Sequence, residues 1–241
     1  DANEAEQVRG IMEALPPKQR SAAVATIAQA VGPRYAGAIA EQLNSKDKAL
    51  SLAFASAGDK TTAGRFTSEL ILKGAQAIKD GTAMKDDKKV TGWKATIAQQ
   101  IDGALPDDRA ATAVKESAYF IAAGIAAENG GSVSTDDIAR SVRLAVGGSI
   151  IERNGKKLPI PAQMSADDFE SRIKAVSPAD IIKQAPEGKV RVAGAEIPAA
   201  EFATSIPGQE LIYAGPGRYA VVVRGRPVTN AGGRPIILEV R

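Results

Sequence analysis

The chain has 241 residues, of which 44% are hydrophobic and only 4% aromatic, and it contains neither cysteine nor histidine. This composition excludes disulfides, thiolate metal sites and every catalytic pair that requires a histidine or a cysteine. The net charge of +3 is small. No apolar stretch approaches the roughly 18 residues that a membrane-spanning helix requires. The core must therefore be built from alanine and the aliphatic residues.

The first part of the chain is rich in alanine and carries apolar residues at helical spacing. A first helix is predicted over residues 3–14, and Pro16-Pro17 separates it from a second helix that continues to about residue 31. Gly32-Pro33 ends that second helix. The remaining helices of this part are expected at 33–43, from a cap at Ser45, at 60–81, around 93–101, at 107–128 and at 135–146. Short helices with short breaks predict a body of stacked helices.

A small hairpin and capped helices are predicted next. Asn154-Gly155, between the short runs of residues 149–158, is the strongest local signal for a β-hairpin. A serine followed three residues later by aspartate favours a helix start, because each side chain can bond the other residue's backbone N–H. This pattern occurs at Ser134, Ser165 and Ser177.

The character of the chain changes near residues 185–188. Beyond them come short β-branched runs separated by glycine, proline and arginine. Strands are expected at 189–193, 210–214, 218–224 and 235–240, with a short helix starting at Pro198. We therefore predict a mainly α protein with two domains. These are a helical body at 1–185, which includes the hairpin near 149–158, and a small β-rich module at 189–241.

The predicted β-rich module carries the whole net charge. Residues 189–241 hold seven basic and four acidic side chains, whereas residues 1–188 hold 24 of each. Exposed arginines can contact phosphate or an acidic partner. The candidate contact residues for nucleic acid or a protein partner are Arg218, Arg224, Arg226 and Arg234.

One candidate catalytic residue is Glu116, in the run Glu116-Ser117-Ala-Tyr119. Lytic transglycosylases place a catalytic acid in a Glu-Ser pair followed by an aromatic residue, and that chemistry requires a carboxylic acid with a raised pKa. The glycine-rich segment that builds the sugar cleft in those enzymes does not follow here. We expect Glu116 to lie on a core helix and the chain not to be an enzyme.

Two further patterns are assigned to structure. Four Asp-Asp pairs start at residues 86, 107, 136 and 167, and three of them lie at predicted helix starts, where a carboxylate complements the helix dipole. The Gly-Arg segments at 215–218 and 232–234 lead into strands, unlike phosphate-binding loops, which open helices. We expect no metal site, no cofactor and no small-molecule substrate.

Three segments carry a resemblance to a known family: Thr61 to Phe66, Gly147 to Pro161, and Gly217 to Pro235. They are similar to the C-terminal region of large virion proteins of short-tailed phages and prophages, which are internal virion (ejection) or transglycosylase-associated proteins. In that family a peptidoglycan-cleaving domain lies upstream, and a helical region with a β-rich tail forms the C-terminus.

The resemblance implies a structural and assembly module that aids genome delivery. Its partners would be other virion proteins, namely portal, tail or companion ejection proteins, together with further copies of itself. Its location would be the virion, and the bacterial envelope or periplasm on ejection. Two alternatives stay open. One is a peptidoglycan-active enzyme fragment that uses Glu116, and the other is a DNA-binding module that uses the C-terminal arginines on phosphate.

Overall fold

A computed structural model describes residues 2–58, 61–83 and 87–240, and it confirms the predicted fold class. The described residues form ten α-helices and a smaller set of antiparallel strands that follows most of them. The chain divides into two compact units. The helical unit comprises Asp1–Ile101 and Ala111–Gly147, and the C-terminal unit comprises Asp102–Ala110 and Gly148–Arg241.

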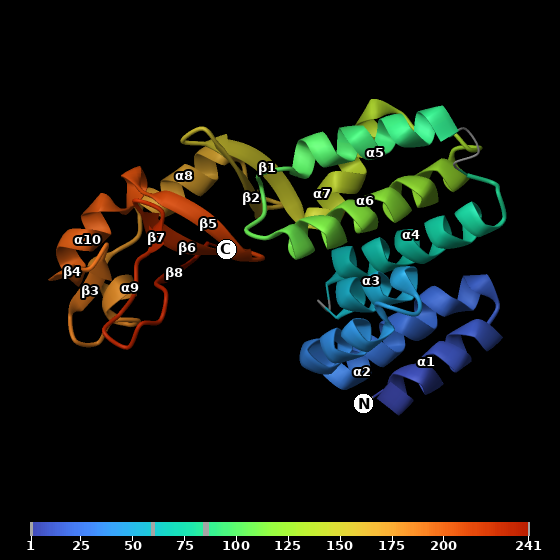
Figure 1. Cartoon of the computed structure of the whole chain (residues 1–241), viewed down its shortest axis with the longest axis horizontal. Coiled ribbons are helices and arrows are strands. Elements are labelled where there is room, and N and C mark those ends of the chain that lie inside the picture. The colour runs from blue at the N-terminus through green and yellow to red at the C-terminus, as the bar shows by residue number, and fades with distance from the viewer. Residues whose placement is uncertain (1, 59–60, 84–86, 241) are drawn as a thin grey trace. The chain divides into compact units, whose positions relative to one another are not determined.

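The helical unit is a stack of helices around an aliphatic core, as its composition requires. Figure 1 shows α2 (Pro17–Leu43), α3 (Lys48–Ala57) and α4 (Thr62–Lys79) lying next to one another in this stack. The buried side chains are mostly alanine, leucine and isoleucine, with Phe54 and Met12 among the largest. The helices are α1 (Ala2–Ala14), α2 (Pro17–Leu43), α3 (Lys48–Ala57), α4 (Thr62–Lys79), α5 (Asp87–Ile101), α6 (Asp108–Glu128) and α7 (Thr135–Val146).

The predicted break at Gly32-Pro33 is a kink within α2. Gly32 has φ +81° and ψ 168°, outside the helical region. Pro33 cannot donate an N–H to the preceding turn, so the kink follows from local chemistry. Val24 and Ala28 before the kink and Ala36 and Ala40 after it are all buried. Both halves of α2 therefore contribute to the same core.

Helices α4 and α6 approach each other closely through two glycines. A Cβ atom at Gly74 would lie 1.8 Å from the carbonyl oxygen of Phe120, and one at Gly124 would lie 2.4 Å from that of Leu70. These are backbone atoms, which cannot move aside as a side chain can. The contact therefore depends on both residues having no side chain.

The predicted serine caps at Ser134 and Ser165 are confirmed as reciprocal capping boxes at the starts of α7 and α8 (Ala166–Lys174). At the start of α9 (Pro178–Ile182), the Ser177 N–H and hydroxyl both donate to the Asp180 carboxylate, while the Asp180 N–H bonds the Ser177 carbonyl. Hydrogen bonds from the Ser134 backbone N–H and hydroxyl lower the pKa of Asp137. The corresponding bonds from Ser165, mainly its hydroxyl, lower the pKa of Asp168. The predicted cap at Ser45 is wrong, because the Asp47 carboxylate accepts the Leu50 N–H at 2.9 Å and begins α3 there.

The C-terminal unit combines hairpins with short helices. The Asn154-Gly155 hairpin is confirmed, with β1 and β2 paired from Gly148–Pro161 to Arg153–Lys156. A four-stranded sheet has the order β5-β6-β7, and β8 also pairs with β6. The elements are β1 (Gly148–Arg153), β2 (Lys156–Pro161), α8 (Ala166–Lys174), α9 (Pro178–Ile182), β3 (Lys189–Val192), β4 (Ala195–Pro198), α10 (Ala199–Ser205), β5 (Glu210–Gly215), β6 (Arg218–Val223), β7 (Arg226–Pro227) and β8 (Ile237–Glu239).

The boundary between the units differs from the predicted domain boundary. The structure divides the chain at Gly147/Gly148 and not near residues 185–188. The reason is the core of the C-terminal unit, in which Phe169, Ile173 and Ile181 are buried together with residues of β5, β6 and β8. The hairpin, α8 and α9 thus belong with the β-rich part, and the change in composition marks no structural boundary.

The strand β4 was not predicted from the sequence. It pairs with β3 in a hairpin whose turn is Ala193-Gly194. Both turn residues have positive φ, +51° and +97°. That geometry matches a two-residue hairpin turn, for which Asn-Gly is the usual sequence and Ala-Gly a weak signal.

The outer edge of β8 is covered by one side chain. The Gln184 amide donates to the carbonyl of Ile237 at 2.8 Å and accepts the N–H of the same residue at 2.9 Å. Asn230 in turn donates to the Gln184 carbonyl at 2.8 Å. The amide of Gln184 therefore pairs with Ile237 as a residue of a neighbouring strand would.

Tyr219 joins the hairpin to the sheet within the buried core. It is fully buried, donates its hydroxyl to the Pro159 carbonyl at 2.9 Å, and packs edge-on against Phe169 with ring centroids 5.0 Å apart. Burial, with a smaller contribution from Tyr213, raises the pKa of the Tyr219 hydroxyl far above its usual value.

We expect Tyr219→Phe to lower the free energy of unfolding by about 1–2 kcal/mol at neutral pH, because it leaves the buried Pro159 carbonyl without its donor. The pH dependence should change as well. A raised folded-state pKa means that the stability is complete below the unfolded pKa of about 10 and is lost as the pH rises above it. The variant should therefore lose less stability than the wild type in alkaline buffer.

Urea unfolding at neutral pH and above pH 10 measures both effects. Tyr35→Phe is the control, since Tyr35 is 67% exposed and should leave both values unchanged. An alkaline loss of stability that is the same in Tyr219→Phe and wild type would contradict this assignment.

Candidate functional site

The four candidate arginines are all exposed. Their side chains make no hydrogen bond or ion pair with any residue in the part of the chain that the structure describes. Arg218 begins β6, whereas Arg224 directly follows its last residue. At about 3.3 Å per residue, the strand holds those two apart by roughly 20 Å. Arg234 lies in a separate turn, in which the Asn230 N–H donates a hydrogen bond to the Arg234 carbonyl. The structure therefore does not gather the four arginines into one site.

Two of them do lie together, at the tip of the hairpin between β6 and β7. Val223 pairs with Arg226, so Arg224 and Gly225 form a two-residue turn. Their φ angles are +51° and +74°. A non-glycine residue is uncommon at such an angle, and asparagine is the usual choice at this turn position. The tip thus presents two partner-free guanidinium groups on a tight turn.

An acidic residue in the neighbouring strand β5, Glu210, is already paired with a lysine. Glu210 in β5 is the register partner of Val222, which lies one residue before the end of β6. Its carboxylate forms an ion pair with Lys156 at 2.6 Å. This carboxylate therefore has a partner other than the two arginines of the tip.

Arg153 was not singled out from the sequence, yet its guanidinium group makes three hydrogen bonds within the C-terminal unit. Only 7% of it is exposed. It donates to the Glu170 carboxylate at 2.7 Å, and to the backbone carbonyls of Pro207 at 2.7 Å and Gln209 at 2.6 Å. Arg153 thereby ties the β1–β2 hairpin to α8 and to the start of β5. In the sequence it is only a charged residue beside a turn, so no local signal marks it.

Arg218 lines a groove of about 710 Å³ within the C-terminal unit. Arg172 and Lys183 bring further positive charge to it, and Asp180 and Glu239 bring negative charge. Lys183 forms an ion pair with Asp180 at 3.3 Å. Charges of both signs therefore line this groove, and they do not select an anionic ligand.

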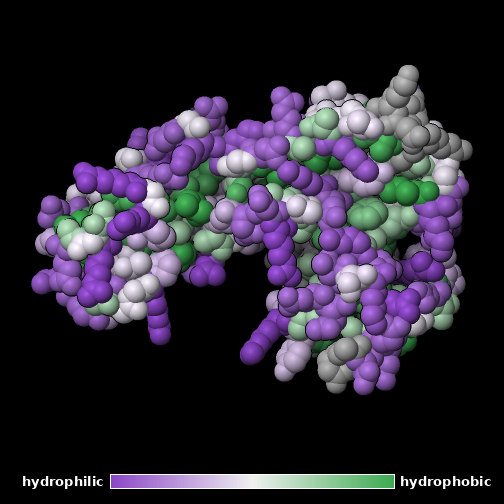
Figure 2. Space-filling view, in the orientation of Figure 1, coloured by the Kyte–Doolittle hydropathy of each residue, from purple (hydrophilic) through white to green (hydrophobic). Residues whose placement is uncertain are grey.

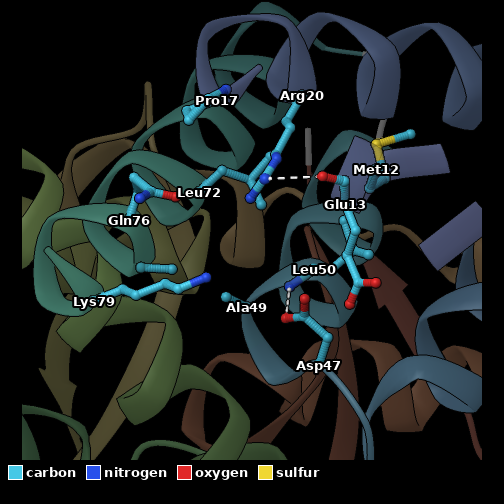
Figure 3. Close-up of a pocket in the computed structure, with 11 residues that line it drawn as sticks. Met12, Glu13, Pro17, Arg20, Asp47, Ala49, Leu50, Leu72, Gln76 and Lys79 are labelled. Carbon is cyan, nitrogen blue, oxygen red and sulfur yellow. Dashed lines mark hydrogen bonds between the residues drawn. The ribbon is translucent and has the colours of Figure 1, made fainter. Parts of the chain in front are cut away.

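A second pocket, of about 460 Å³, lies among the first four helices of the helical unit and is shown in Figure 3. Two of its polar side chains complete helix ends. Arg20 donates to the carbonyls of Leu15 at 3.1 Å and Glu13 at 3.4 Å, which close α1, and Asp47 caps α3. Lys79 extends toward the pocket from α4 in the same view. The Glu13 carboxylate instead accepts a hydrogen bond from Arg9, and the Gln76 amide donates to Asp80.

Glu116 forms an ion pair with Lys48 at 2.8 Å, which joins α6 to α3. Three of the acidic pairs lie at helix starts as predicted. Asp107 accepts the Ala110 N–H at 2.7 Å, and Asp137 and Asp168 belong to capping boxes. The pair at Asp86 lies partly outside the described residues.

Within the described ranges, no three aspartate or glutamate side chains cluster as metal ligands would. The helices described include none that is long and apolar enough to cross a membrane. Hydrophilic residues cover most of the face that Figure 2 shows. Comparisons of the chain with protein-family models, with curated proteins and with solved structures gave no match.

Proposed function

We propose that the chain is a structural and assembly module of a virion-associated protein of a short-tailed phage, and that it binds copies of itself or other virion proteins. The resemblance of residues 61–66, 147–161 and 217–235 to that family supports the proposal. In this proposal the module resides in the virion and reaches the bacterial envelope or periplasm when the genome is ejected.

The structural observation that carries the proposal is an exposed aromatic side chain on the helical unit. Tyr35 is 67% exposed and lies two residues after the α2 kink. Tyrosine is enriched at protein interfaces, where one side chain can supply much of the binding energy. Ile11 on α1 is also 53% exposed. We assign Tyr35 to the contact surface of the assembly.

The test is the mass of the chain in solution, measured by size-exclusion chromatography with light scattering over a range of concentrations. We expect Tyr35→Ser to weaken self-association or binding of virion partners by about 30-fold, the effect of losing a central interface residue worth about 2 kcal/mol. Ile182→Ser is the matched control, because it removes a 42% exposed apolar side chain from the C-terminal unit.

Equal losses in both variants would show that the effect is not specific to α2. A chain that is monomeric at every concentration and binds no portal, tail or ejection protein would contradict the proposal.

A further inference from the structure

We infer that the β6–β7 hairpin tip, through Arg224 and Arg226, binds the phosphate backbone of double-stranded DNA. This function goes beyond assembly, and it uses two of the four predicted arginines. The juxtaposition that supports it is two exposed, partner-free guanidinium groups on either side of Gly225.

The fold itself does not explain an arginine at position 224. The C-terminal unit has two other hairpins with the same positive-φ turn, Asn154-Gly155 and Ala193-Gly194. Their first turn residues are Asn154, the favoured type, and Ala193, which has a small side chain. Asn154, Ala193 and Arg224 all have φ +51°. A residue that breaks a local preference without a compensating contact marks a place where function, not folding, sets the choice.

The charge around the tip favours an anionic ligand. Glu210, the acidic residue registered beside the end of β6, is paired with Lys156. In the β1–β2 hairpin, Glu152 and Lys157 are register partners of opposite charge. Neither Arg224 nor Arg226 forms an ion pair with a described residue, so both positive charges are available to a ligand.

The shape and chemistry of the tip favour duplex DNA over a protein. The guanidinium fork matches phosphate oxygens in pairs. DNA offers one phosphate per strand for about every 3.4 Å of helix axis, so both arginines find an acceptor without a matched pair of carboxylates. The major groove, about 12 Å wide, admits a two-stranded ribbon. We expect contacts to phosphate without base readout.

The experiment measures binding of the full chain to a fluorescein-labelled duplex of mixed sequence by fluorescence anisotropy, over a series of KCl concentrations. The wild type should bind, with affinity that falls as salt rises. In the Arg224→Ala/Arg226→Ala double variant, binding should weaken and the slope of log affinity against log salt should decrease by about 2, one for each lost phosphate contact.

Two controls separate this site from net charge and from misfolding. Arg218→Ala/Arg234→Ala removes the same charge from two other exposed arginines of the unit and should keep the wild-type slope. Arg224→Asn gives the turn its favoured residue, so it should raise thermal stability slightly while weakening DNA binding. Opposite changes in one variant cannot result from damage to the fold.

Three results would overturn the inference. The first is a wild type that shows no salt-dependent DNA binding, and the second is an equal loss of binding in the two double variants. The third is arginine-dependent binding of polyglutamate as tight as that of the duplex, which would identify an acidic protein segment as the ligand.

Discussion

Gly74→Ala is expected to destabilise the helical unit by about 3 kcal/mol, because its new methyl group would lie 1.8 Å from the Phe120 carbonyl oxygen. Relief requires α4 and α6 to move apart, and this would open the packing around the neighbouring buried residues Ile71 and Ile121. The better helix propensity of alanine offsets at most about 1 kcal/mol.

Urea unfolding followed by tryptophan fluorescence measures this loss, since the chain has one tryptophan, Trp93, and it lies in α5 of the helical unit. The matched control is Gly10→Ala. Gly10 is also inside a helix, but a Cβ there would meet nothing within 4 Å. That change should stabilise the chain by about 0.5–1 kcal/mol. If both variants shift the urea midpoint of unfolding in the same direction, α4 and α6 do not approach each other as closely as described.

Arg153→Met is the second large effect, with an expected loss of about 3 kcal/mol in the C-terminal unit. The substitution keeps a long apolar side chain but removes the donors to Glu170 and to the carbonyls of Pro207 and Gln209. The Glu170 side chain is 34% exposed, so its carboxylate can regain water. Most of the loss therefore comes from the two carbonyls and from the detached hairpin.

Hydrogen–deuterium exchange on the full chain locates the effect, with faster exchange expected in β1, β2 and the start of β5. Lys156→Met is the control on the same hairpin. Its side chain is 61% exposed and paired with Glu210, so its loss should cost less than about 1 kcal/mol. A change in Arg153→Met no larger than this control would remove the anchoring role of Arg153.

Local chemistry made much of the fold predictable. The serine caps at Ser134, Ser165 and Ser177, the Asn154-Gly155 turn and the α2 break each depend on residues within four positions of one another. Such signals act before any long-range contact forms. They located most helices and strands, but they carried no information about which elements share a core.

The missed features all depend on residues far apart in the chain. The boundary at Gly147/Gly148 follows from the burial of Phe169 and Ile181 against the later strands. The role of Arg153 follows from carbonyls more than fifty residues away. For the candidate site, the sequence named the four arginines, and the structure shows that all four are exposed. The separation of Arg218 from Arg224 and Arg226 by the length of β6 could not be foreseen without the register of the sheet.

The side chain of Gln184 has a consequence for how the chain behaves at high concentration. An uncovered strand edge recruits further strands from other molecules, and such growth has no natural limit. Since the Gln184 amide already occupies the N–H and the carbonyl of Ile237, a second molecule cannot extend the sheet at that residue without displacing it. The Gln184 amide thus works against the addition of a further strand at this edge of β8.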